Sequence, residues 1–159
     1  MSLRIRGTGS LIFKPEKVLA AEKRASKATL SKMGAFVRTR ARTQHLRRRK
    51  RTSEPGEGPS VHSRDKYANL RNIRFQVNKD ATEVVVGPLK ITRGGRARPV
   101  TGTVPSVLEH GGMVAIKKDR STRGKRLVVV QVEKRPFMAK AFRDVLPMFA
   151  KELKGKVKE

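Results

Sequence analysis

The chain has 159 residues, the size of one ordinary domain, and its hydrophobic fraction of 36% is enough for a modest core only. It carries 39 Lys and Arg against 13 Asp and Glu, a formal net charge of +26, so an isolated copy repels itself and we expect its native setting to supply a polyanion. The absence of cysteine excludes disulfides and thiolate zinc sites, and no apolar run is long enough for a secretory signal or a bilayer span.

The first predicted elements are an N-terminal arm, residues 1–14, and a long basic helix within residues 15–51. Pro15 suits the first turn of a helix, because an N–H group at this position would have no intrahelical acceptor and its loss costs nothing. The amphipathic pattern runs to about Leu46, and 30 residues of helix would be about 45 Å long, so part of it should project from so small a domain. Seven residues at three- and four-residue steps form the stripe that predicts this helix, namely Leu19, Glu22, Ser26, Leu30, Met33, Val37 and Ala41.

The end of this predicted helix is the most basic part of the chain. Residues 1–51 hold 16 basic and 2 acidic residues, a net of +14. Residues 52–66 follow as a flexible loop rich in Ser, Pro and Gly. Lys and Arg alone suffice to neutralise phosphates without reading bases, and the chain has one Tyr and no Trp for base stacking. We therefore expect contact with DNA or another polyanion through Arg38, Arg40, Arg42, Arg47, Arg48, Arg49, Lys50 and Arg51, and through a second patch at Arg93, Arg96 and Arg98.

The remaining residues, 67–154, alternate between strand and helix patterns. Residues 70–77 and 83–87 predict one hairpin, and residues 113–116 and 127–132 predict another, with one helical turn between them at residues 105–110. A C-terminal helix begins at Pro136, with Pro147 expected to kink it, and residues 155–159 form a tail. Together with the first helix they predict an α+β fold, an antiparallel sheet of about four strands packed by two helices. The expected packing anchors are Ile73, Phe75, Pro136, Phe137, Phe142 and Phe149.

No set of residues in the sequence has the spacing of a catalytic or metal site. His45, His62 and His110 stand apart from one another and from other ligands. The Gly94-Gly95 loop lacks the Walker pattern and no helix is expected after it. We therefore expect no enzymatic activity, no metal and no cofactor.

Four short motifs occur in a recognisable order along the chain. They are the Pro-Gly-rich loop at residues 54–59, the Asn-Leu-Arg-Asn-Ile segment at residues 69–73, the valine strand ending in Gly-Pro at residues 84–88 together with the Leu108-Glu109-His110-Gly111 step, and the Arg-Pro-Phe-Met sequence at residues 135–138. In this order, after a long N-terminal helix, they resemble the neck or tail-completion proteins of tailed phages, the head–tail joining family that includes minor-tail-protein-Z-like members.

The resemblance implies a structural virion protein, made in the host cytoplasm and located in the neck or tail of the particle. It implies a homo-oligomeric ring, expected to be hexameric, that joins the tail to the head connector around the DNA channel. Its neighbours would be the connector or adaptor and the tail terminator or tube proteins, with non-specific DNA contact and no membrane. The alternative from composition alone is a free nucleic-acid-binding protein of the ribosome- or nucleoid-associated type.

Overall fold

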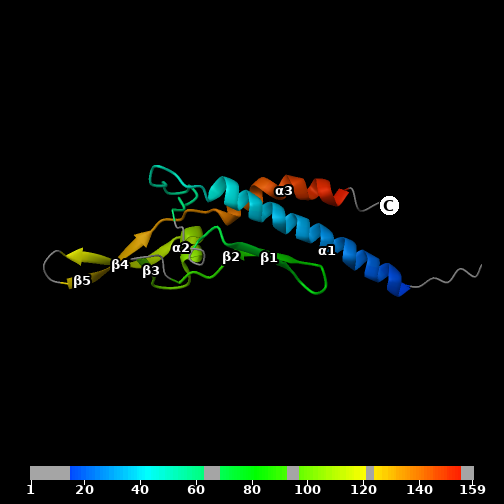
Figure 1. The fold of residues 1–159 in the computed structure, drawn as a ribbon, viewed down its shortest axis with the longest axis horizontal. Helices are drawn as coiled ribbons and strands as arrows, with labels where there is room; N and C mark the ends of the chain where they lie inside the picture. Colours follow the sequence, from blue (N-terminus) through cyan, green and yellow to red (C-terminus); the bar gives the residue numbers. More distant parts are fainter. Residues whose placement is uncertain (1–14, 63–68, 93–96, 121–123, 155–159) are drawn as a thin grey trace, which may run out of the picture.

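The computed structural model describes residues 15–62, 69–92, 97–120 and 124–154. Helix α1 (Pro15–Arg40) is the longest element, and one π-helical turn, η1 (Ala41–His45), continues it (Figure 1). The buried residues of α1 begin only at Thr29, although the predicted stripe begins at Leu19. Residues 15–25 are therefore exposed on all sides, and this end of α1 projects beyond the rest of the molecule (Figure 1).

Within the described residues, five strands form two antiparallel sheets. Strand β1 (Ile73–Val77) pairs with β2 (Val84–Pro88). The second sheet has the order β3-β4-β5, with β3 (Ala97–Pro99), β4 (Gly112–Arg120) and β5 (Gly124–Val132). The α+β fold with a long N-terminal and a C-terminal helix is confirmed, whereas the strands are divided between two sheets instead of sharing one.

The C-terminal helix α3 (Met138–Lys154) lies antiparallel against α1 and continues through Pro147. An ion pair at each end fixes this direction: Lys32 binds Glu152 at 2.6 Å, and Arg40 lies 3.6 Å from Asp144. Between the helices and β1 lies the main core, which is formed by Val37, Ala41, Leu46, Ile73, Phe137, Ala141 and Val145.

Gly34 allows the first hairpin to approach α1 closely. A Cβ at this position would lie 2.8 Å from the ring of Phe75 and 3.0 Å from Val84, closer than carbon atoms pack. The absent side chain thus lets the ring of Phe75 cover the helix backbone. The guanidinium of Arg38, one turn further along α1, lies over the same ring at 5.1 Å from its centroid.

The second sheet is attached through the short helix α2 (Val104–His110), whose N-terminus is capped by Thr103. Val107 of α2 and Val114 of β4 are both buried where these two elements meet. They line an apolar cavity of about 190 Å³. The β4–β5 hairpin extends from this layer toward the end of the molecule opposite the projecting end of α1 (Figure 1). Among the described residues, no helix combines the length and the apolar character needed to cross a membrane.

Candidate functional site

The predicted polyanion contact begins on the last turns of α1, where two of its arginines serve the fold. Arg38 covers the ring of Phe75, and Arg40 forms its ion pair with Asp144 of α3. Nε2 of His45 lies within hydrogen-bond distance of the same carboxylate of Asp144, at 3.0 Å. Both arginines are half-buried, so only part of each charge is available to an external partner.

The helix ends at η1 and does not continue to residue 51. The N–H of Leu46 donates to the carbonyl of Ala41 at 2.9 Å, an i→i+5 bond that turns the fully buried Leu46 side chain into the core. Arg47 covers this helix end: its Nε donates to the carbonyl of Thr43, and its Nη2 donates to Gln44 at 3.0 Å. The guanidinium of Arg47 therefore donates to the backbone carbonyl of Thr43, one of the groups for which a helix terminus offers no intrahelical donor.

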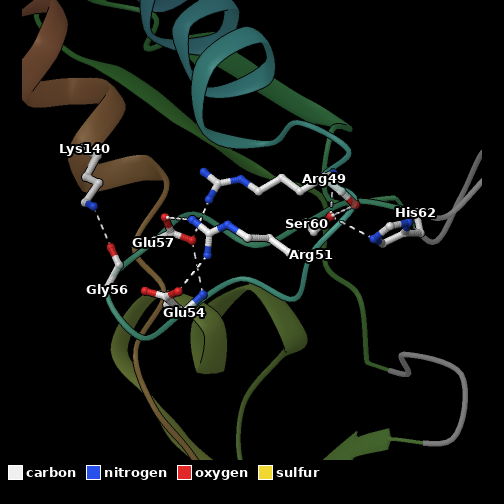
Figure 2. A network of polar contacts seen from close by, with 8 residues as sticks. All are labelled: Arg49, Arg51, Glu54, Gly56, Glu57, Ser60, His62 and Lys140. Carbon is white, nitrogen blue, oxygen red and sulfur yellow. Dashed lines mark hydrogen bonds and ion pairs between the residues drawn. The ribbon is translucent and has the colours of Figure 1, made fainter.

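The basic run is the segment of residues 38–51 that holds most of the predicted contacts. Two further arginines of this run are bound within the loop that follows it (Figure 2). Arg49 binds one carboxylate oxygen of Glu57 at 2.6 Å, and Arg51 binds the other at 2.8 Å. Arg51 also reaches Glu54 at 2.9 Å. Residues 47–62 are thus folded back on themselves by ion pairs.

The carboxylate of Glu57 lies at the centre of this network. The backbone N–H of Glu54 donates to it at 3.2 Å and is the main reason why the pKa of Glu57 is lowered from its usual 4.5. Partial burial opposes this shift, while the hydrogen bond from Arg51 and the positive charges of Arg51 and Arg49 lower the pKa further. Glu57 is therefore ionised across the neutral pH range and holds the loop.

Three cations of the run remain exposed without such a role. Across the described parts of the chain, no carboxylate lies within ion-pair distance of Arg42, Arg48 or Lys50. Arg98 on β3 is exposed as well, whereas Arg93 and Arg96 lie outside the described residues. The surface able to meet a polyanion is thus smaller than the basic run in the sequence suggests.

A second polar centre lies at the start of α3, where Glu109 caps the helix. Its carboxylate accepts hydrogen bonds from the backbone N–H groups of Phe137 at 2.9 Å, Met138 at 3.1 Å and Ala139 at 2.8 Å. A negative charge at a helix N-terminus is stabilised both by these donors and by the helix dipole. The N–H of Arg135 also donates to the carbonyl of Leu108 at 2.6 Å.

The Pro-Gly-rich loop meets the same junction. The N–H of Gly56 donates to the carbonyl of Lys134 at 3.0 Å, and Nζ of Lys140 donates to the carbonyl of Gly56 at 2.5 Å (Figure 2). Three of the sequence motifs, which are separated by up to about 80 residues, are therefore joined around the first turn of α3. Sequence reasoning did not assign Glu54, Glu57 or Glu109 a role, although Glu54 stands at the i+3 position from Arg51.

The predicted packing anchors differ in how deeply they are buried. Ile73 and Phe137 are buried in the main core, and Phe75, Pro136 and Phe149 are half-buried. Phe142, predicted as another packing anchor, is 48% exposed. Its ring contacts that of Phe149 edge-on, with centroids 5.9 Å apart, at the rim of an apolar groove.

The histidines do not converge on one place. His45 pairs with Asp144, His62 lies 2.8 Å from Ser60, and His110 is exposed at the end of α2. No three His, Asp or Glu side chains within the described residues are arranged to hold a metal ion. The two polar centres are thus structural networks of ion pairs and backbone hydrogen bonds.

Comparison with known proteins adds no family to this description. No protein-family model, curated protein or solved structure matches the chain. The likeness to phage neck proteins consequently depends on the order of the four motifs in the sequence alone.

Proposed function

We propose that this chain is a structural subunit of a tailed-phage neck, which completes the tail and joins it to the head connector as a ring around the DNA path. The observation that supports this most is the amount of apolar surface outside the small core. Large apolar side chains are exposed on the projecting end of α1, on β2, on the β4–β5 hairpin and on α3. Surfaces of this kind mark contacts with other protein subunits.

The β4–β5 hairpin illustrates the point. Val114 faces α2, whereas Met113, Leu127 and Val129, on the opposite face of the two strands, are more than half exposed. Strands with apolar residues on both faces are typical of sheets that are covered on both sides. One cover is α2, and in the proposed ring the other is a neighbouring protein.

The charge fits a subunit that encloses DNA without reading its sequence. Arg42 is exposed within η1, Arg48 and Lys50 are exposed shortly after it, and each can neutralise one phosphate. The proposed partners are further copies of the chain, the connector or adaptor on the head side, and the terminator or tube on the tail side. In this proposal the protein has no catalytic role.

The test is a stop codon early in the gene within its phage, with the intact gene supplied from a plasmid as the control. We expect electron microscopy of the lysate to show filled or unfilled heads separate from tails, and joined particles when the plasmid is present. Particles whose tails are firmly attached in the absence of the protein would contradict the proposal.

The alternative, a free nucleic-acid-binding protein, is distinguished by a gel-shift series against salt. Tight binding of duplex DNA by the monomer at physiological salt would favour the alternative. Weak binding that strengthens only when the protein is assembled would favour the neck subunit, because the exposed Arg42, Arg48 and Lys50 of one copy give a small salt-dependent contribution that a ring multiplies.

A further inference from the structure

The apolar groove beside Phe142 and Phe149 is lined without a single charged side chain. Its floor is α1, its walls are β2 and α3, and its volume is about 260 Å³. On the α3 side the groove is bordered by the exposed ring of Phe142 and by Leu146, one turn further along the helix. The residues that line it are Met33, Gly34, Val37, Val84, Val86, Met138, Phe142 and Phe149.

The same chain carries an apolar ridge that none of its own elements covers. Residues 15–25 of α1 are exposed around the whole helix, and Val18 and Leu19 are more than half exposed. Leu19 belongs to the stripe that is buried further along at Met33 and Val37. The helix thus presents its core-facing stripe beyond the point where its own chain packs against it.

The projecting end of α1 carries three basic residues, Lys17, Lys23 and Arg24, together with two acidic ones. Both acidic residues among the first 51 lie on the projecting end, and one of them, Glu22, is one turn from Val18 and Leu19. Next to the groove, Arg143 is exposed one turn from Leu146. No carboxylate within the described residues pairs with Arg143.

We infer that the projecting end of α1 of one copy lies in the groove between β2 and α3 of a second copy, with Leu19 against Phe142 and Leu146 and with Glu22 beside Arg143. Because ridge and groove are different surfaces of one chain, the contact is head-to-tail, and it repeats from copy to copy to form a ring where the rotation between copies closes. This inference rests on the proposed neck ring, for which it identifies the contact between subunits.

A single chain cannot satisfy this contact within itself. Asp144 of α3 lies beside Arg40, which is 21 residues along α1 from Leu19, or about 32 Å at 1.5 Å per residue. Leu146 is two residues after Asp144, so Leu19 and Leu146 of the same copy are about 30 Å apart, whereas a disulfide requires Cα atoms within about 7 Å. The chain has no cysteine of its own to confuse the result.

The experiment is therefore oxidative cross-linking of the full chain carrying both Leu19→Cys and Leu146→Cys, at about 0.5 M salt to screen the repulsion between copies. We expect a ladder of dimers, trimers and larger species on a non-reducing gel. An equal mixture of the two single-cysteine proteins should give mixed dimers and no ladder. Monomers alone across a concentration series, or dimers of either single variant by itself as abundant as the mixed dimers, would overturn the inference.

Charge reversal provides an independent measurement by sedimentation equilibrium. Glu22→Arg and Arg143→Glu should each weaken association several-fold, and the double variant should recover most of it. Leu19→Asp should weaken association at least about tenfold. Its matched control is Val85→Asp on β2, because Leu19 and Val85 are equally exposed at 64% and 63%.

The outcomes separate this inference from the proposed function. If Leu19→Asp and Val85→Asp associate like the unchanged protein, the subunit contact is wrong, while tail attachment in the stop-codon phage still decides the function. If the ladder forms and the phage lacking the protein keeps its tails, the contact is right and the neck function is wrong. Thermal melting of every variant checks that these exposed substitutions leave the fold intact.

Discussion

Replacing Glu109 by alanine should destabilise the whole fold, because this carboxylate is the N-terminal cap of α3. It accepts three backbone N–H groups, and Phe137, which supplies one of them, is completely buried. Loss of a capping side chain costs about 1 kcal/mol, loss of the charge at the helix N-terminus about 0.5 kcal/mol, and an unsatisfied buried N–H at least about 1 kcal/mol. The sum is about 3 kcal/mol, a large fraction of the stability of a domain.

Urea unfolding followed by far-ultraviolet circular dichroism measures this loss. For a chain of this size, about 3 kcal/mol corresponds to a melting temperature lowered by about 6–12 °C. Glu109→Gln keeps a carbonyl oxygen as acceptor and loses the charge, so its loss should be about half as large. Glu133→Ala removes an exposed carboxylate and is the matched control. A Glu109→Ala protein as stable as the Glu133→Ala protein would refute the capping role.

Three further predictions concern the loop after α1. The folded pKa of Glu57 is below 4.5, so its ionised form stabilises the fold above that pH. The difference in unfolding free energy between the unchanged protein and Glu57→Gln should be constant near neutrality and should disappear as the pH falls through the lowered pKa. Urea midpoints measured against pH check this. Gly58→Ala should lower the stability by about 1–3 kcal/mol, because a Cβ there would collide with the carbonyl of His45, whereas Gly87→Ala, with nothing within 4 Å, should unfold like the unchanged protein. Arg48→Ala should reduce the slope of log affinity for DNA against log salt concentration by about 0.9 without lowering the melting temperature. Arg51→Ala breaks ion pairs with Glu54 and Glu57 and should lower the melting temperature instead. Equal slopes for Arg48→Ala and the unchanged protein would show that Arg48 contacts no phosphate.

The regular elements could be predicted where their periodicity was strong. The three- and four-residue steps around Met33 and Val37 predicted α1, and the alternation from Ile73 to Val77 predicted β1. Strand β3 was missed, because three residues ending in Pro99 contain no alternation to detect. The division into two sheets could not be predicted either, because local sequence patterns do not specify which strand pairs with which, and here β3 pairs with β4.

The basic run shows why composition overstated the candidate site. A count of arginines treats each as a solvated charge, yet Arg49 and Arg51 are bound by Glu57, which lies eight and six residues away. That spacing was visible in the sequence, but the Ser-Pro-Gly composition of the loop suggested a chain without fixed contacts. The capping by Glu109 was harder to predict, because its acceptor role depends on a helix that begins 29 residues later.

The core between α1 and α3 has a consequence for how the protein is made. Val37 and Ala41 on one side, and Phe137 and Val145 on the other, are about 100 residues apart in the chain, so the core closes only through contacts of high sequence separation. During synthesis α1 leaves the ribosome long before α3 exists to cover it. The core-facing residues of α1, Val37 among them, therefore lack their native cover until α3 has been synthesised, and the core forms only after that.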